Sequence, residues 1–260
     1  MNQKTLLFIQ NRTGGRKERG GFVSMLAAVC YPPRCPVCDG LLWVDERICG
    51  AECRNKLPEI DGPRCLRCSK PIENDEAEYC YDCERRQFHC ERGYAIWRYD
   101  KVMSESIARF KYKGRREYAA FYSEELLRLA GDYIRRYAPE VFVPVPLHRK
   151  RMAARGYNQA ELIAVRLERA TGIPSIRLLR RIRNTLPQKE LNDKDRMKNV
   201  GAAFALNERR LQSLGGIPDS VMLIDDICTT GSTLEACAQV LKDAGVQRVL
   251  FLTLCIGRGF

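Results

Sequence analysis

The sequence contains no long apolar run. Of its 260 residues 45% are hydrophobic, yet no stretch approaches the roughly 20 consecutive apolar residues that a membrane-spanning helix needs. The apolar patch at residues 22–31 is too short for a span, and no small-residue cleavage site follows it. We therefore expect no membrane span and no standard secretion signal, and we expect the protein to be cytoplasmic.

Low-complexity tracts are also absent, and a chain this apolar is not typical of disordered proteins. Acidic residues are in the minority, because 32 Asp and Glu stand against 44 Lys and Arg and the net charge is +12. This balance favours an anionic partner, which could be a nucleic acid, a phosphorylated metabolite or an anionic membrane surface. Composition alone does not choose among these partners.

Composition divides the chain into three parts. We expect a flexible leader over residues 1–29, a cysteine-rich module over residues 30–90 and a larger domain over residues 91–260. In the larger domain, apolar strands alternate with helices, the strands at 93–99, 141–145, 221–224 and 249–256 and the helices at 103–112, 118–137, 159–170 and 232–244. A capping box of Ser232 and Glu235 is expected to begin the last helix. The alternation predicts an α/β fold with a parallel sheet flanked by helices.

The 13 cysteines are unevenly distributed, since ten of them lie between residues 30 and 90. In a chain without a secretion signal, paired cysteines at short spacing indicate a metal site rather than disulfides. Eight of the ten form four such pairs, namely Cys35 and Cys38, Cys49 and Cys53, Cys65 and Cys68, and Cys80 and Cys83.

Each pair can present two thiolates to one metal ion, and two pairs complete a tetrahedral site. Eight ligands predict two Zn²⁺ ions, which we expect to be structural because four thiolates close each site. Iron–sulfur clusters are the second choice. The pairs can combine in sequence or in a cross-brace, and the simpler sequential arrangement is favoured.

One segment combines two acids with a turn rich in hydroxyl groups. The apolar strand at 221–224 is followed by Asp225 and Asp226, and a helix begins shortly afterwards. Free N–H groups and the dipole at a helix N-terminus favour a phosphate group. Two acids would repel that phosphate unless they bind something else, and a ribose diol or a Mg²⁺ ion on a pyrophosphate would suit them. The turn between the acids and the helix consists of Thr229, Thr230, Gly231, Ser232 and Thr233.

This segment resembles the signature with which type I phosphoribosyltransferases bind phosphoribosyl pyrophosphate (PRPP), and it lacks the GxxxxGK[ST] pattern of a Walker A loop. Over residues 31–260 the chain is similar to the ComF/GntX family of competence-associated proteins. The resemblance implies a double zinc ribbon fused to a phosphoribosyltransferase-like domain, and a role in handling imported single-stranded DNA during natural transformation. Besides the cysteine pairs, the shared motifs are FKYKG at 110–114, PVPL at 144–147, RGYNQ at 155–159, TLPQ at 185–188 and RMKN at 196–199.

The resemblance also implies a chemistry, the Mg²⁺-dependent transfer of ribose 5-phosphate from PRPP to an acceptor with release of pyrophosphate. We therefore expect a phosphoribosyltransferase. Asp225 and Asp226 would hold the ribose hydroxyls, directly or through Mg²⁺, and residues 229–233 would cradle the 5′-phosphate. A loop over 147–157 and a mobile loop over 184–200 would bind and cover the pyrophosphate. The side chains expected there are Lys111, Arg149, Arg155, Asn158, Gln159, Gln188 and Arg196.

Two other classes of function stay open. Zinc ribbons and basic loops could bind single-stranded DNA and a helicase-like competence partner, with bases stacking on exposed aromatic rings. The domain could instead sense PRPP without turning it over. A steep loss of affinity with salt would indicate DNA binding. The aromatic residues concerned, for which we favour a packing role, are Tyr81, Phe88, Tyr94 and Trp97.

Overall fold

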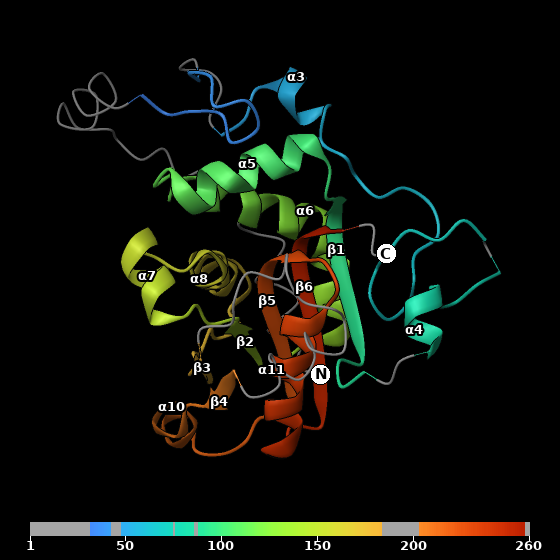
Figure 1. Ribbon diagram of the computed structural model, residues 1–260, viewed down its shortest axis with the longest axis vertical. Coiled ribbons are helices and arrows are strands. Elements are labelled where there is room, and N and C mark those ends of the chain that lie inside the picture. The colour runs from blue at the N-terminus through green and yellow to red at the C-terminus, as the bar shows by residue number, and fades with distance from the viewer. Residues whose placement is uncertain (1–31, 43–47, 75, 86–87, 184–202, 258–260) are drawn as a thin grey trace.

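The computed structural model describes residues 32–42, 48–74, 76–85, 88–183 and 203–257. At its centre is a parallel sheet in which the strands follow the order β1-β6-β5-β2 (Figure 1). The leader expected at residues 1–29 lies outside the described residues. The strands of the sheet are β1 (Arg92–Arg98), β2 (Val141–Pro144), β5 (Ser220–Cys228) and β6 (Arg248–Ile256).

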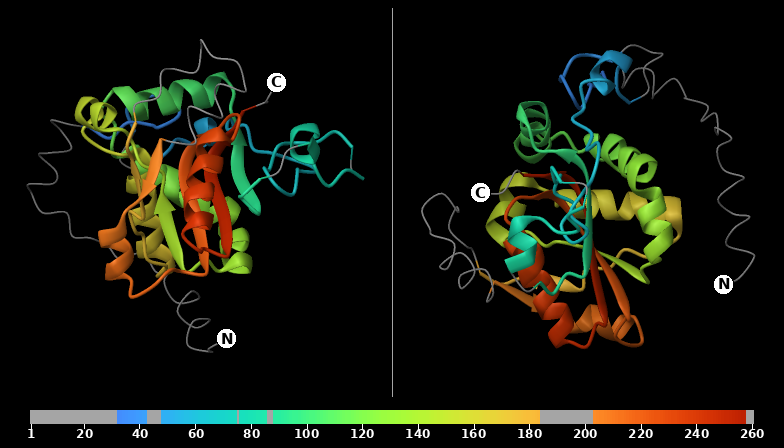
Figure 2. Two further views of the ribbon diagram at one scale, coloured as in Figure 1. Left: turned by 60° about the horizontal axis from the view of Figure 1, so that its bottom comes forward. Right: turned by 90° about the vertical axis from the view of Figure 1, so that its right-hand side faces the viewer.

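Helices cover both faces of this sheet, as the right-hand view of Figure 2 shows. Successive side chains of a strand point to opposite faces, so Met222 and Leu250 pack in one core while Val221 and Val249 pack in the other. The inner strands are therefore apolar without alternation at Val221–Ile224 of β5 and Val249–Leu252 of β6. The first core contains α5 (Lys101–Tyr112), α6 (Tyr118–Tyr137) and α8 (Gln159–Thr171), and the second contains α11 (Ser232–Asp243).

The cysteine-rich module divides between these two faces. Its first half contains α3 (Ala51–Arg54) and contributes Cys35 and Val37 to the core of α5 and α6. Its second half contains α4 (Tyr81–Arg85) and contributes Cys65 and Cys83 to the core of α11. Figure 1 shows α3 beside α5 and α4 on the other side of β1.

The expected fold class is confirmed, and the predicted strands and helices of the larger domain recur with small shifts of their ends. The main difference is β5, which continues past Ile224 to Cys228 and so includes both acids. Within the described parts of the chain, none of the helices has the length and apolar character that a membrane span requires. In the described part of the larger domain, four short elements were not predicted, namely α7 (Arg149–Arg155), β3 (Leu179–Arg181), β4 (Phe204–Leu206) and α10 (Glu208–Ser213).

The expected capping box at the start of α11 is wrong. The N-cap is Gly231, with a φ of 75°, and no side chain caps the helix. Glu235 instead accepts hydrogen bonds from the backbone N–H groups of His89 and Cys90. A contact between residues this far apart in the chain competes with the local cap, and sequence spacing cannot reveal it.

Gly93 in β1 provides a test of the sheet packing. It lies opposite Phe251 of β6, and a Cβ atom at Gly93 would overlap the Phe251 ring. We expect Gly93→Ala to lower the free energy of unfolding by about 1–3 kcal/mol, because the ring has to move within a packed core. Gly216→Ala is the control, since nothing lies within 4 Å of its added Cβ. Thermal and urea unfolding would measure both changes, and equal stability of the two variants would contradict this packing.

Candidate functional site

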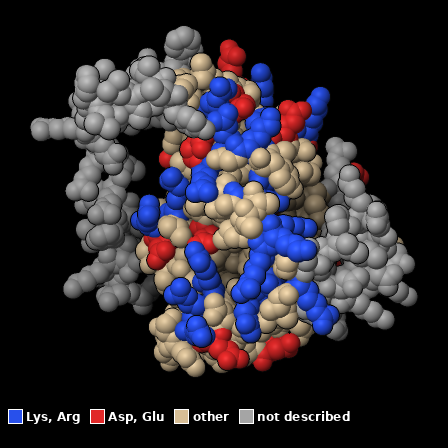
Figure 3. Space-filling view, turned by 60° about the vertical axis from the view of Figure 1, so that its left-hand side comes forward, with Lys and Arg blue, Asp and Glu red and all other residues tan. Residues whose placement is uncertain are grey.

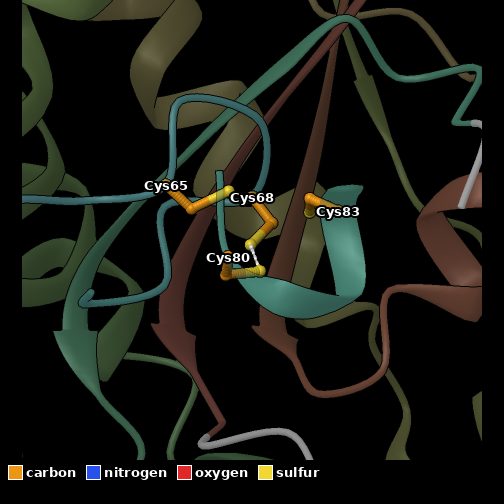
Figure 4. A group of neighbouring side chains, drawn as sticks. All are labelled: Cys65, Cys68, Cys80 and Cys83. Carbon is orange, nitrogen blue, oxygen red and sulfur yellow. Dashed lines mark hydrogen bonds between the residues drawn. The ribbon is translucent and has the colours of Figure 1, made fainter. Parts of the chain in front are cut away.

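The eight predicted ligand cysteines lie in two clusters. In the second half of the module, the four Sγ atoms lie within 4.8 Å of one another, and Figure 4 shows that they come from two facing turns. In the first half, the Sγ atoms of Cys35, Cys38 and Cys53 meet the same limit, and Cys49 Sγ lies 3.7 Å from Cys35 Sγ. The thiols are thus grouped in the sequential arrangement. The second cluster consists of Cys65, Cys68, Cys80 and Cys83.

The two halves repeat one local structure. The backbone N–H of Cys35 donates to Gly40 O, and that of Cys65 donates to Lys70 O, both at 2.8 Å. Four residues after these cysteines, Asp39 and Ser69 adopt left-handed φ angles of 63° and 66°. Each turn brings two thiols to one side, which is how a zinc knuckle presents its ligands.

The donor set of each cluster fits Zn²⁺. Thiols at this distance cannot all ionise without a cation, and their protons are distributed unequally. The hydrogen bond with Cys49 lowers the pKa of Cys35 to about 4, and the same bond raises the pKa of Cys49. A Zn²⁺ ion would deprotonate all four thiols and hold the two turns together.

A second group of functional residues lies at the carboxyl edge of the sheet. A cavity of about 230 Å³ opens there, at the edge where parallel α/β sheets commonly bind their ligands. Most of the sequence-predicted residues outside the cysteines contribute to its wall, while Arg151 and Arg181 contribute without having been predicted. The predicted residues in the wall are Lys111, Arg155, Asn158, Gln159, Asp225, Asp226, Thr229 and Thr233.

The two acids reach this cavity from opposite faces of β5. Asp226 forms an ion pair with Lys111 of α5, whose Nζ lies 2.8 Å from Asp226 Oδ1. Burial opposes the charge of Lys111, but Asp226 and Asp225 outweigh it and raise the pKa of Lys111. Burial, followed by the neighbouring charge of Asp226, raises the pKa of Asp225 to about 7. The Lys111 ammonium group therefore stays protonated at neutral pH, whereas Asp225 changes its charge near neutral pH.

Cationic groups exceed acidic groups in the cavity. Lys111, Arg151, Arg155 and Arg181 stand beside two aspartates. Burial and the charge of Arg151 lower the pKa of Arg181, so the guanidinium groups are close enough to repel one another. Gln159 adds a buried Nε2 without a hydrogen-bond partner, while its Oε1 accepts from Arg155 at 3.0 Å. The cavity therefore favours an anion with several oxygen atoms.

Other predicted residues lie elsewhere. Arg149 is exposed on α7 and does not line the cavity, because the segment expected as a loop forms a short helix. Asn158 lines the cavity, and it also caps α8 and donates from Nδ2 to Val145 O at 3.0 Å. Its role is thus partly to join α8 to the end of β2. Gln188 and Arg196, with the loop expected at 184–200, lie outside the described residues.

The hydroxyl-rich turn faces two ways. Thr233 lines the cavity at the sheet edge, Thr230 and Gly231 line a smaller one beside the second cysteine cluster, and Thr229 lines both. Thr230 Oγ1 and Ser232 Oγ are 3.0 Å apart and hydrogen-bonded. The turn therefore lies between the cavity and the cysteine-rich module.

The aromatic residues considered for base stacking are mostly packed. Trp97 is fully buried, and Tyr94 packs against Tyr133 with ring centroids 5.2 Å apart. Phe88 packs in the core of α11 and lies beneath Arg67. Only Tyr81 is largely exposed among the four, at 64%, so the favoured packing role holds for the other three.

Comparisons with known proteins identify relatives of this chain. The family model of the double zinc ribbon domain matches residues 26–84. Competence protein F of Haemophilus influenzae is 30% identical over 221 residues, which cover 83% of this chain and 93% of that protein. The chain belongs to the ComF family. Competence protein ComFC of Bacillus subtilis is also similar, with 32% identity over 79% of this chain and 82% of that protein.

Further relatives of this ComF-family chain have other names. The DNA utilization protein YhgH of Escherichia coli K12 is 29% identical over 77% of the chain and 87% of that protein. Among solved structures, a purine phosphoribosyltransferase from Pyrococcus horikoshii matches with 18% identity and a TM-score of 0.33, over 52% of this chain and 74% of that one. The resemblance to the family is confirmed, and the cysteine clusters and the ribbon match together support zinc binding.

Zinc content tests the two clusters separately. We expect wild-type protein to hold about two Zn²⁺ per chain, and Cys53→Ser and Cys80→Ser to lose about one each, because each removes a thiolate from a different tetrahedral site. Cys90→Ala is the matched control, since Cys90 is buried near the second cluster but is not part of it. Mass spectrometry of the metal would measure the content, and loss of zinc from Cys90→Ala would contradict the ligand assignment.

The raised pKa of Asp225 predicts a pH-dependent effect on stability. A carboxyl group with a raised pKa in the folded state contributes stability that is present below its unfolded pKa and is lost as the pH rises through its folded pKa, here about 7. The amide side chain of Asp225→Asn does not ionise, so the variant does not lose this stability as the pH rises. We expect the variant to gain more stability over wild type at pH 8 than at pH 5, by about 2 kcal/mol.

Urea unfolding at the two pH values would measure the difference. Asp132→Asn is the control, because the Asp132 side chain is 98% exposed. An Asp225→Asn gain that is the same at pH 5 and pH 8 would show that the carboxyl does not titrate in this range.

Proposed function

We propose that this protein binds PRPP together with Mg²⁺ in the cavity at the carboxyl edge of the sheet and transfers its ribose 5-phosphate to an acceptor. One observation carries the proposal. The cavity combines two adjacent aspartates, a hydroxyl-rich turn at a helix N-terminus and an excess of cationic side chains. PRPP needs all three, since it has a ribose diol, a 5′-phosphate and a pyrophosphate.

Each part of the ligand has a counterpart in the cavity wall. Asp225 and Asp226 can accept hydrogen bonds from the ribose hydroxyls. The N–H groups and the helix dipole at the start of α11, together with the hydroxyls of the turn, suit the 5′-phosphate. Arg151, Arg155 and Lys111 suit the pyrophosphate, because guanidinium and ammonium groups bind phosphate oxygens.

The reaction that follows is a substitution at the anomeric carbon. The bond from this carbon to the pyrophosphate oxygen breaks, the electron pair leaves with the pyrophosphate, and the acceptor forms the new bond. Positive charge develops on the ribose, and the Asp225 and Asp226 carboxylates lie where they can stabilise it. The cationic side chains stabilise the negative charge of the leaving group. No covalent intermediate with the protein is needed.

The residues present fit a Mg²⁺ ion, because carboxylate and phosphate oxygens are the ligands that it prefers. Asp225 and Asp226 would hold it, and it would supply neutralisation of the pyrophosphate charge. Ionisation of Asp225 near neutral pH makes the binding of a cation there pH-dependent.

The names of the relatives support a proposal about the biological setting. Competence protein F, ComFC and the DNA utilization protein YhgH are similar over most of this chain. We therefore propose that the protein acts in competence and in the uptake or use of DNA, which the words competence and DNA utilization in those names support. Its acceptor would then be found among molecules that arise in that process.

A second candidate is single-stranded DNA binding, and the surface charge favours it. Figure 3 shows Lys and Arg side chains gathered on one face of the molecule. Such a face supports non-specific contact with a phosphate backbone. The exposed basic residues on α7, β3 and α10 are Arg149, Lys150, Arg180, Arg209 and Arg210.

Calorimetric titration of zinc-loaded protein with PRPP, with and without Mg²⁺, tests the first proposal. We expect micromolar, Mg²⁺-dependent binding that Asp226→Asn weakens by roughly ten- to a hundredfold, because hydrogen bonds to a charged group contribute about 1.5–3 kcal/mol. Asp132→Asn, which removes an exposed carboxylate, should bind like wild type. A pyrophosphate-release assay with candidate acceptors then tests transfer.

The outcomes separate the proposals. Binding without pyrophosphate release would contradict transfer and leave a PRPP sensor. No binding at millimolar PRPP would contradict the site as a whole. Affinity for single-stranded DNA that falls steeply with salt would support the second candidate.

A further inference from the structure

The first cysteine cluster is connected directly to the helix that provides Lys111. The carbonyl groups of Pro36 and Val37 lie within the turn between the ligands Cys35 and Cys38. Pro36 O accepts from Ser106 Oγ at 2.6 Å, and Val37 O accepts from Arg109 Nη2 at 2.5 Å. Both donors belong to α5, in which Ser106 and Arg109 lie within the two turns before Lys111. The turn that a metal closes therefore also holds α5.

The second cluster is connected in a similar way to the opposite wall. Arg67, between the ligands Cys65 and Cys68, donates to Cys83 O at 2.8 Å and lies over the ring of Phe88. The next residues, His89 and Cys90, donate their backbone N–H groups to the Glu235 carboxylate. The Cys90 thiol also donates to Leu234 O at 3.8 Å.

Glu235 lies in the first turn of α11, directly after the hydroxyl-rich turn. Little space separates that turn from the second cluster. The cavity between them has a volume of about 30 Å³ and is lined by Lys70, Cys68, Thr229, Thr230 and Gly231 among others. A cavity of this size holds only about two or three water molecules. The hydroxyl-rich turn and the second cluster therefore lie on opposite sides of one small cavity.

We infer that the two zinc ribbons are positioning elements, each of which holds one wall of the ligand site. The first holds α5 and thereby Lys111 against Asp226, and the second holds the hydroxyl-rich turn through Glu235. The inference rests on the proposed function only for its consequence, which is that zinc in either cluster tightens PRPP binding. The statement that each ribbon holds one wall of the site does not depend on which ligand binds there.

Metal ligation matters here because the ribbons have little core of their own. Their turns are held by a few backbone hydrogen bonds and by the four thiols. Without the metal, the turns lose their main cross-link. Carbonyl groups that lie between two ligands then lose their fixed direction, and α5 loses two hydrogen bonds. The expected result is local mobility of one wall with the central sheet intact.

Hydrogen exchange of the full chain tests this without any ligand. Cys53→Ser and Cys80→Ser disrupt one cluster each. We expect Cys53→Ser to increase the exchange rate of amides in residues 101–112 at least tenfold and to leave residues 229–237 within twofold of wild type. Cys80→Ser should do the reverse. The amides of β5 and β6 serve as the internal reference for an intact fold.

Glu235 provides a second test that keeps both clusters. Glu235→Ala removes the acceptor of the His89 N–H group, whereas Glu235→Gln keeps an oxygen there. We expect faster exchange of residues 229–233 in the alanine variant and recovery of most of the protection in the glutamine variant. Asp243→Asn, at the exposed end of the same helix, is the matched control and should change nothing.

The PRPP titration adds the functional consequence. Cys80→Ser and Glu235→Ala should weaken PRPP binding at least fivefold, and Glu235→Gln by less than twofold. If wild type binds no PRPP, the proposed function fails while the exchange data still decide the inference. Unchanged exchange at residues 229–233 in both Cys80→Ser and Glu235→Ala would overturn the inference, even with PRPP binding intact.

Discussion

The ion pair between Lys111 and Asp226 is the contact on which the arrangement of the site depends. It joins α5, which is held by the first ribbon, to β5, which is the strand that ends in the hydroxyl-rich turn. A buried ion pair costs desolvation, and it is stable only where its surroundings fix the geometry. Here α5 is held by hydrogen bonds to the carbonyl groups of Pro36 and Val37, which lie in the turn that a metal would close. The cysteine-rich module and the α/β domain therefore depend on each other at this point.

The remaining charges around the pair do not balance, and this imbalance is informative. Asp225 is destabilised as an anion by burial and by Asp226, while Arg151, Arg155 and Arg181 crowd into the same cavity. Groups whose pKa values are shifted and that gather in a cavity are typical of functional sites. Hydroxyl donors of a ligand would stabilise the buried carboxylates, and its anionic oxygens would reduce the repulsion among the guanidinium groups. That reciprocal fit favours a phosphorylated sugar over a simple anion.

Much of this could be predicted from local sequence patterns. The cysteine spacing indicated two clusters, and the strand, acids and turn at 221–233 indicated the centre of the site, because both signals are contained in short segments. Arg151 and Arg181 were missed because their proximity depends on α7 and on β3, a three-residue strand that pairs with β4 across a long segment. Glu235 was misassigned because a good local cap and a distant backbone donor compete for one carboxylate, and only the tertiary structure decides between them.

The position of the ribbons explains why a metal is useful in this fold. A parallel sheet fixes the ends of its strands, but it does not fix the helices and turns that extend beyond its carboxyl edge. In this chain, α5 and the turn before α11 both extend there, and each is contacted by one ribbon from outside. A small segment cannot hold such a contact through hydrophobic burial alone, because it has too little apolar surface. Four thiolates around one ion would supply that stiffness within short turns, so each ribbon can support one wall of the site.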